Sequence, residues 1–212
     1  MVAVNQAKEG HETKALGSLE KAASFGFADS TAVATEPAFE DLRSNGRFLK
    51  AEQSVKRALL NVGFGLEDLA GKKVERKDYE GKVVVLDIWG TWCPPCRAEI
   101  PHFVELQKKY ADKGFTVIGL TWERRPPDDN IREMVKRFAK DNGMNYPVVM
   151  LTPDRLQAVP DLRGFPTTLF FGRDGTLRNR LVGLHDLAAL EKEVSKLIAE
   201  KAPAKEAAEK SF

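Results

Sequence analysis

The sequence predicts an α/β fold in which a central mixed sheet is flanked by helices on both faces. Residues 83–88 (VVVLDI) form a short, continuous apolar run, as strands buried on both faces do. Apolar residues then follow at helical spacing over residues 95–113, before a second buried run at 115–122 (FTVIGLTW). Near the end of the chain, residues 172–175 (GRDG) separate two further apolar segments and indicate a hairpin.

Turn signals and capping residues define the other elements. Asp128 and Asp129 suit the start of a helix over residues 131–140, because aspartate side chains accept hydrogen bonds from unpaired backbone N–H groups. Gly114 ends the preceding helix, and Asp186 opens a last helix. The remaining predicted strands cover residues 147–151, 167–171 and 176–182.

Composition narrows the function classes. The net charge is +2, which is too small to argue for a nucleic-acid or anionic-membrane partner, and no basic cluster is interleaved with aromatic residues. No run of about 18 apolar residues predicts a membrane span. The first residues (MVAVNQAKEGHETK) lack the apolar core of a signal peptide. We therefore expect either a cytoplasmic protein or one whose export segment is missing from this sequence.

Residues 1–59 are expected to form a helical extension to a domain at 60–200, and residues 201–212 a disordered tail. Residues 15–27 (ALGSLEKAASFGF) resemble the second helix of a tetratricopeptide repeat, and residues 36–59 resemble the segment that caps such arrays. One repeat cannot bury its own apolar face, so this stretch either docks on the following domain or belongs to a longer array. Both a module for a protein partner and an irregular helical extension stay open.

The chain has two cysteines, Cys93 and Cys96, within the stretch GTWCPPCRAEIP. A structural disulfide between them would close a tiny loop, which constrains the unfolded chain little. A structural zinc site needs four ligands, and the three histidines of the chain do not stand at ligand spacing. A copper(I) site made of two thiolates stays open, as does a redox couple.

The position of Cys93 favours the redox couple. Cys93 follows a strand and precedes a helix, so we expect it at the helix N-cap, where free N–H groups and the helix dipole lower the pKa of its thiol. Pro94 and Pro95 suit the first helical turn. Cys96 lies one turn further on, within bonding range of Cys93. We expect Cys93 to attack a substrate disulfide, and the more buried Cys96 to resolve the mixed disulfide.

The stretch WGTWCPPCR resembles the active site of thioredoxin-fold proteins, in particular the TlpA/ResA-like thiol–disulfide oxidoreductases. Residues 60–82 are similar to the lead-in strands of that group. Pro101 falls where a proline interrupts the first active-site helix, and Gly183 matches the glycine after the last strand. Residues 163–168 (RGFPTT) match the loop that carries a cis-proline facing the cysteines. The resemblance covers residues 60–199 and implies a thioredoxin fold there.

The resemblance also implies roles for individual residues. Cys93 would be the exposed nucleophile and Cys96 the resolving thiol. Asp87 would be the buried acid that moves protons to or from Cys96. Pro166, with the backbone of Phe165, would offer an edge to an extended substrate segment and keep metal ions from the thiols. Thioredoxin proper pairs its buried acid with a lysine on the next strand, where this chain has a glycine at position 119, so the proton path stays open.

Physical arguments add to these roles. A charge at Asp87, among apolar neighbours, is costly to bury, so its pKa should rise; the alternative is that Asp87 faces solvent at the strand end. We expect Trp89 in the core, and Arg97 and Glu99 on a solvated helix face. The expected substrate-binding residues are Trp92, Pro94, Pro95, Phe165 and Pro166.

We therefore expect a thiol–disulfide oxidoreductase that reduces protein disulfides and needs no cofactor beyond the Cys93–Cys96 disulfide. Its partners would be protein disulfide or dithiol substrates and a thiol electron donor, with a further protein partner at residues 1–59. The alternatives are a copper(I) carrier that uses the same cysteines, and a repeat-based scaffold with a secondary redox site. The resemblance favours a location outside the cytoplasm, whereas the sequence shows no export signal, so the location stays open.

Overall fold

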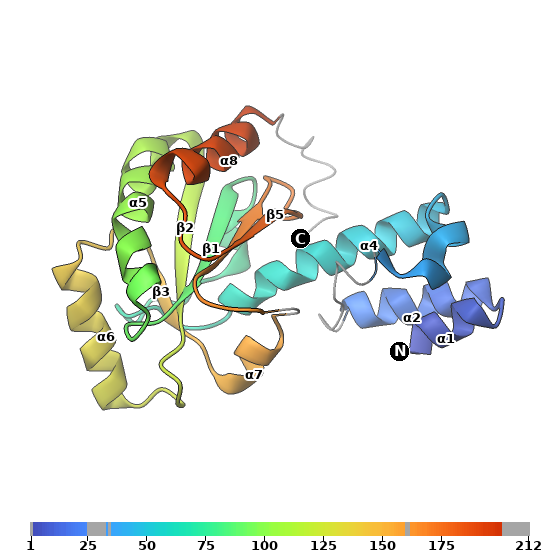
Figure 1. Cartoon of the computed structure of the whole chain (residues 1–212), viewed down its shortest axis with the longest axis horizontal. Helices are drawn as coiled ribbons and strands as arrows, with labels where there is room; N and C mark the ends of the chain where they lie inside the picture. The colour runs from blue at the N-terminus through green and yellow to red at the C-terminus, as the bar shows by residue number, and fades with distance from the viewer. Residues whose placement is uncertain (1, 25–32, 34, 160–161, 201–212) are drawn as a thin grey trace.

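The structure is a computed structural model that describes residues 2–24, 33, 35–159 and 162–200 (Figure 1). The predicted tail at 201–212 and part of the repeat-like stretch at 15–27 lie outside the described residues. The α-helices are α1 (Val2–Lys8), α2 (Glu12–Ser24), α4 (Gly46–Ala58), α5 (Pro94–Tyr110), α6 (Asp129–Asp141), α7 (Pro153–Gln157) and α8 (Leu187–Ala199). The short 3-10 helices are η1 (Pro37–Leu42), η2 (Leu59–Gly63), η3 (Arg76–Tyr79) and η4 (Ala111–Lys113). The strands are β1 (Val83–Trp89), β2 (Phe115–Thr121), β3 (Val148–Met150), β4 (Thr167–Phe171) and β5 (Leu177–Val182).

The strands form one mixed sheet, in the order β3-β2-β1-β4-β5, which confirms the predicted fold class. Strands β1, β2 and β3 run parallel, whereas β4 pairs antiparallel with both β1 and β5. Helix α5 supplies the crossover that the parallel pair β1–β2 requires. Strand β1 is the central strand, and all of its residues from Val83 to Trp89 are buried.

Two hydrophobic clusters cover the two faces of the sheet. Alternate residues of β1, including Val85 and Trp89, pack against residues of α5, α6 and α8. Leu86 and the other intervening residues of β1 pack against η2 and the residues around α7. Asp87 shares the first face with Val85 and Trp89, so its side chain lies beneath α5, the helix that carries the cysteines.

The expected lead-in strands at residues 60–82 are not found; this expectation is wrong. The segment forms η2, η3 and two isolated bridges, Glu67–Lys73 and Asp68–Val149. Gly65 and Gly71 adopt φ angles of 78° and 81°, a left-handed conformation that glycine tolerates. These two turns lie on either side of the bridge residues Glu67 and Asp68.

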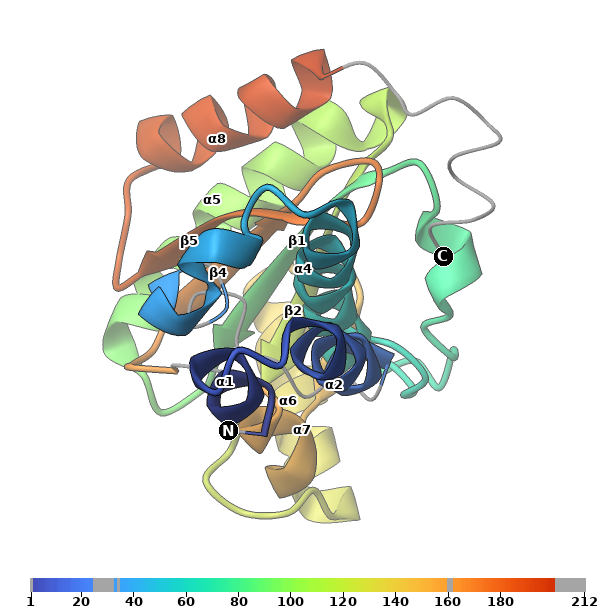
Figure 2. The same cartoon turned by 90° about the vertical axis from the view of Figure 1, so that its right-hand side faces the viewer.

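Helices α1, α2 and α4 pack beside one another on one side of the sheet (Figures 1 and 2). Buried residues of α2 and α4, with Phe39 and Leu42 from η1, form a hydrophobic cluster that is distinct from the two clusters on the sheet. Helix α1 packs against this cluster with partly buried residues. Helix α4 runs directly into η2, whose residues belong to the sheet's second cluster. The division at residue 59 and the likeness to a tetratricopeptide repeat stay predictions.

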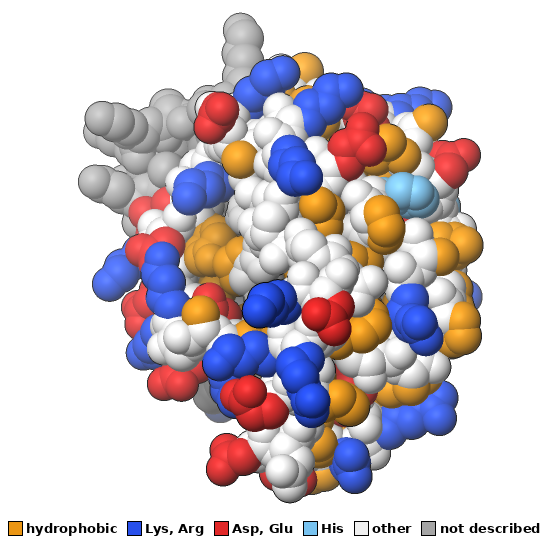
Figure 3. Space-filling view, turned by 90° about the vertical axis from the view of Figure 1, so that its left-hand side faces the viewer, with side chains coloured by type: hydrophobic (Ala, Val, Ile, Leu, Met, Phe, Trp, Pro, Cys, Tyr) orange, Lys and Arg blue, Asp and Glu red, His pale blue; other side chains and the backbone are white. Residues whose placement is uncertain are grey.

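The described helices and surface add two observations. None of the helices in the described ranges is both long and apolar enough to cross a membrane. On the face that carries α5 and α6, Lys and Arg side chains are interspersed with Asp and Glu side chains (Figure 3). Charges of both signs therefore share this face.

The N-terminal cluster predicts a local effect of Phe48→Ala. Phe48 is 2% exposed, and its ring centroid lies 5.5 Å from that of Phe39. Truncation leaves a cavity, so we expect helices α1, α2 and α4 to lose about 3 kcal/mol of stability. Hydrogen exchange should then show lost protection in residues 2–24 and 35–58 and intact protection in the sheet.

Leu49→Ala is the matched control, because the neighbouring Leu49 is 44% exposed. We expect it to leave exchange unchanged. Equal loss of protection in the helices and in β1 of Phe48→Ala would contradict two separately packed clusters.

Candidate active site

The turn from β1 into α5 depends on Gly90. A Cβ atom at this position would lie 2.5 Å from Nε1 of Trp92 and 2.7 Å from the carbonyl oxygen of Trp122. Because glycine has no side chain, the Trp92 indole can fold back and donate a 2.7 Å hydrogen bond to that carbonyl. This bond ties the residue before Cys93 to the end of the neighbouring strand.

A second anchor, Glu123, is absent from the sequence prediction. Its carboxylate accepts hydrogen bonds from the backbone N–H of Thr91 (3.0 Å) and from the Thr91 hydroxyl (2.6 Å). The hydroxyl of Thr121 donates a third, of 2.7 Å. Thr91 precedes Trp92 and Cys93, so Glu123 fixes the chain immediately before the cysteine pair.

Cys93 is the N-cap residue of α5, as predicted, and its sulfur accepts a hydrogen bond from the Cys96 N–H at 3.3 Å. Pro94 and Pro95 occupy the first helical turn. The two cysteines form a disulfide, with their Cα atoms 5.3 Å apart. No group of three or more His, Cys, Asp or Glu side chains in the described ranges could hold a metal ion, so the two sulfurs, when reduced, are the groups suited to a soft ion.

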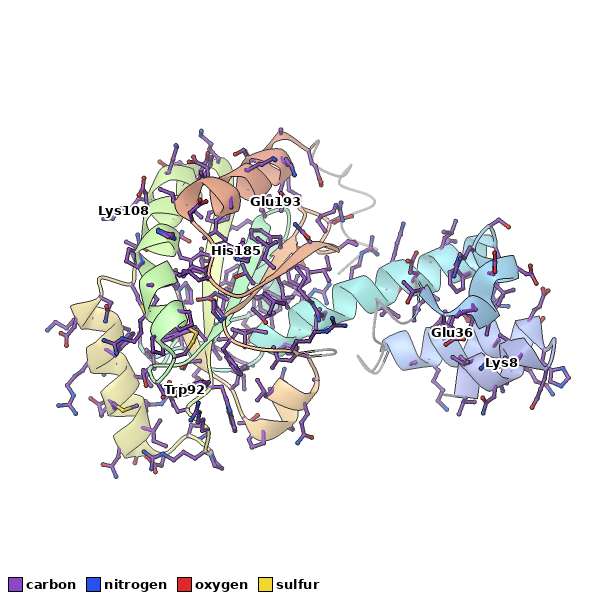
Figure 4. The ribbon with its side chains drawn as sticks, in the orientation of Figure 1. Lys8, Glu36, Trp92, Lys108, His185 and Glu193 are labelled. Atoms are coloured by element: carbon purple, nitrogen blue, oxygen red, sulfur yellow. A yellow bond between two sulfur atoms is a disulfide. The ribbon has the colours of Figure 1, made fainter. Side chains whose placement is uncertain are left out.

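The expectation that Cys93 is exposed is wrong for this disulfide form. Cys93 is 3% exposed and Cys96 is 1% exposed. Both belong to the hydrophobic cluster under α5, together with the partly buried rings of Trp92 and Phe165. The disulfide lies beside Trp92, where α5 begins (Figure 4). A thiol can therefore attack Cys93 only after the rings of Trp92 and Phe165 move away from the sulfur.

An aromatic rim borders the cysteines. The rings of Trp92 and Phe165 meet edge to face, with centroids 5.2 Å apart. The guanidinium of Arg124 lies 3.7 Å from the Trp92 ring centroid, within cation–π range. Pro94 is exposed, whereas Pro95 is half-buried. These residues form the accessible surface next to the buried disulfide.

The loop at residues 163–168 lies at this rim, because Phe165 contacts Trp92. The Phe165–Pro166 peptide bond is cis, as the resemblance implied, and Pro166 is buried. The carbonyl of Pro166 accepts a 2.9 Å hydrogen bond from the N–H of Gly183, the residue that follows β5. The two segments thus hold each other at the edge of the site.

Asp87 is 1% exposed, so the alternative of a solvent-facing side chain is wrong. Burial raises the pKa of Asp87 well above its ordinary value, and the nearby Glu99 carboxylate raises it further. Burial disfavours any charge on Asp87, and a negative charge on Glu99 disfavours a second one beside it. Burial and the charge of Glu99 therefore both favour the protonated form of Asp87.

Glu99 was expected on a solvated helix face, and this expectation is wrong. Its side chain is 1% exposed, whereas Arg97 is exposed as expected. Oε1 of Glu99 accepts a 2.8 Å hydrogen bond from the backbone N–H of His185. Burial raises the pKa of Glu99 to about 7, against the lowering effect of that hydrogen bond. One signal was available: Glu99 lies three residues after Cys96, hence on the same helix face.

Comparison with known proteins places residues 61–180 in the AhpC/TSA family, whose profile they match. The thiol-disulfide oxidoreductase ResA of Bacillus cereus is 34% identical over 134 residues, which span 63% of this chain and 74% of that protein. ResA of Bacillus subtilis is 32% identical over 135 residues, which span 62% of this chain and 70% of that protein.

Solved structures agree with these relatives. A thioredoxin-family thiol:disulfide interchange protein from Chlorobium tepidum has a TM-score of 0.55 and 30% identity, over 63% of this chain and 91% of that one. A DsbF homologue from Corynebacterium diphtheriae has a TM-score of 0.53 and 29% identity, over 62% of this chain and 82% of that one. The chain belongs to the AhpC/TSA family and is a thiol–disulfide oxidoreductase of thioredoxin fold.

Proposed function

We propose that this protein reduces disulfides in other proteins through a mixed disulfide at Cys93, which Cys96 resolves. The observation that carries the proposal is the position of Cys93. Its sulfur lies at the N-terminus of α5 and accepts the Cys96 N–H. That environment stabilises a thiolate, which is the form of cysteine that attacks disulfides.

The reaction has two exchange steps. In the first, the Cys93 thiolate attacks one sulfur of the client disulfide; the client S–S bond breaks, and the departing client thiolate takes up a proton. In the second, Cys96 loses its proton, and its thiolate attacks the Cys93 sulfur and releases the other client thiol. The client gains two electrons and two protons, and Cys93 and Cys96 are left oxidised. A thiol electron donor returns two electrons and two protons to the pair.

Asp87 and Glu99 handle the Cys96 proton in this scheme. Asp87 lies on β1 beneath α5, Glu99 is a buried residue of α5, and the charge of Glu99 raises the pKa of Asp87. Because the pKa of Glu99 is about 7, its carboxyl can accept or release a proton near neutral pH. Burial favours the protonated form of Asp87 as well, so the two acids carry one negative charge between them before the transfer. The Cys96 proton neutralises that charge, and the negative charge passes to the Cys96 thiolate.

The rim supplies the client surface. Trp92 and Phe165 offer apolar rings beside the cysteines, and Pro94 is exposed next to them. Pro95 and Pro166 complete this surface in our proposal. An extended client segment would lie along residues 165–166. Its disulfide would reach Cys93 when the rings of Trp92 and Phe165 move aside. We further propose that residues 1–59 contact a protein partner, as their separate hydrophobic cluster suits an independent module.

Replacing the resolving cysteine tests the proposal. In Cys96→Ser the second step is blocked, so a disulfide-containing peptide should accumulate as a covalent 1:1 adduct on Cys93. Mass spectrometry of the non-reduced protein measures this adduct. Cys93→Ser is the matched control and should form at least tenfold less adduct, in keeping with an activated thiolate only at Cys93.

Absence of the adduct in Cys96→Ser would contradict the proposal. If the reduced wild-type protein then bound one equivalent of copper(I), the copper-carrier alternative would replace it.

The raised pKa of Glu99 predicts a pH-dependent stability. The native state holds the Glu99 proton more tightly than the unfolded chain does, so its contribution is fully present below about pH 4.5 and is lost as the pH rises through 7. The Glu99→Gln variant does not lose this stability as the pH rises, because glutamine does not titrate. Between pH 4.5 and 8, its free energy of unfolding should fall by about 3 kcal/mol less than that of the wild type.

Urea unfolding at several pH values measures the difference. Glu105→Gln, on an exposed position of the same helix, should follow the wild-type curve. Parallel curves for wild type and Glu99→Gln would show that the Glu99 carboxyl does not titrate as described.

A further inference from the structure

The Tyr146 ring packs beside Gly119, in the hydrophobic cluster on the face of the sheet that Asp87 shares. In β2, Gly119 is the register partner of Asp87 on β1 and of Val148 on β3. A Cβ atom at Gly119 would lie 3.3 Å from Cε2 of Tyr146 and 3.0 Å from Nε1 of Trp89. The space above the bare backbone of Gly119 is thus bordered by the Tyr146 ring and the Trp89 indole, on the face that Asp87 also shares.

The polar atoms around this space are complementary in hydrogen bonding. Among the described residues, the Tyr146 hydroxyl, Trp89 Nε1 and the Thr168 hydroxyl are buried without a hydrogen-bond partner. So are one oxygen of Asp87 and one of Glu99. Thr168 is the register partner of Asp87 on the opposite side, in β4. Within the described ranges, three buried donors and two buried carboxyl oxygens thus lack a partner in this part of the core. An unsatisfied buried group of this kind is costly.

Electrostatics place the Tyr146 hydroxyl within the influence of both acids. Burial raises the pKa of Tyr146 well above its ordinary value, and the carboxylates of Asp87 and Glu99 raise it further. The phenol therefore keeps its proton at neutral pH and acts only as a donor toward a carboxylate. Tyr146 is also among the residues that line an open hollow of about 500 Å³ beside β3.

We propose that Tyr146 is a positioning residue that donates its phenol hydrogen bond to the ionised Asp87–Glu99 pair, and so sets the pH at which the pair accepts the Cys96 proton. The bond forms directly, by rotation of the side chains, or through one bound water. The hydrogen bond from Tyr146 stabilises the negative charge of the pair. The pKa of the pair is therefore lower than burial alone would make it. The role in proton transfer from Cys96 rests on the proposed function; the effect on the carboxyls does not.

The other titratable groups around the pair are few. Cys93 and Cys96 lie above it on α5. His185 approaches from the β5–α8 loop, with Nδ1 3.8 Å from Oε1 of Glu99, and its carbonyl contacts Nδ1 of His102 at 3.2 Å. A titration must therefore separate the carboxyls from the two imidazoles, which carbon NMR of labelled carboxyl groups does.

Tyr146→Phe is the test, since it removes one oxygen and keeps the ring. In the oxidised protein the cysteines do not titrate, so the ¹³C shifts of the Asp87 and Glu99 carboxyls report their own protonation. We expect the midpoint of the pair to rise by about 0.5 to 1 pH unit in Tyr146→Phe. Tyr110→Phe is the matched control: Tyr110 and Tyr146 are each 7% exposed, but the Tyr110 hydroxyl donates to Glu191 at 2.6 Å. Its midpoint should equal that of the wild type.

A purely structural role gives a different result. Tyr146→Phe would then remove a buried hydroxyl that lacks a partner, leaving stability equal or higher and the carboxyl midpoint unchanged, and this outcome would overturn the proposal. In client reduction, the acid limb of the rate profile should shift to higher pH with the midpoint, which lowers the rate on that limb by about three- to tenfold. If the midpoint shifts while wild-type protein reduces no client, the Tyr146 link to the carboxyls stands and the proposed function fails.

Discussion

The central position of β1 is the constraint on which the site depends. With β2 on one side, β4 on the other and hydrophobic clusters on both faces, no residue of β1 reaches solvent. A carboxyl at position 87 must therefore be buried, and its pKa must rise. The same strand delivers the chain to Gly90, where the turn into α5 begins. The acid and the cysteine pair are thus positioned by one rigid element.

Helix α5 carries the other functional groups of the site. Its N-terminus holds Cys93, and its inner face carries Cys96 and Glu99 over the sheet. The cysteines meet the positive end of the helix dipole, whereas Glu99 meets a low-dielectric core and a single backbone donor. In the proposed mechanism, one helix therefore favours a negative charge at its first sulfur and a proton at its buried carboxyl. Cys93, the proposed nucleophile, and Glu99, the proposed proton acceptor, are less than two helical turns apart.

The sequence was sufficient for features set by local chemistry. The apolar run with one aspartate indicated a buried strand and a perturbed acid, and the strand–cysteine–proline order indicated the N-cap. Features set by distant segments were not predictable in this way. Among the described residues, the one backbone donor to the buried Glu99 is the N–H of His185, 86 residues later, which bonds to one of its two oxygens. The Tyr146 ring packs beside Gly119, on another strand, where a Cβ atom would lie only 3.3 Å from the ring. Cys93 belongs to a hydrophobic cluster against which the ring of Phe165 packs, and Phe165 is distant from Cys93 in the sequence. Residues 60–82 form η2, η3 and two isolated bridges in place of the expected strands.

The reduction potential of the Cys93–Cys96 pair tests the central claim, reduction of protein disulfides, most directly. Equilibration with redox buffers of known potential, followed by trapping of free thiols, measures it on the wild-type chain. The account predicts a value near that of thioredoxin, about −270 mV, at which the reduced pair donates electrons to protein disulfides. A value near that of the strong oxidant DsbA, about −120 mV, would contradict it, because the pair would then install disulfides rather than remove them.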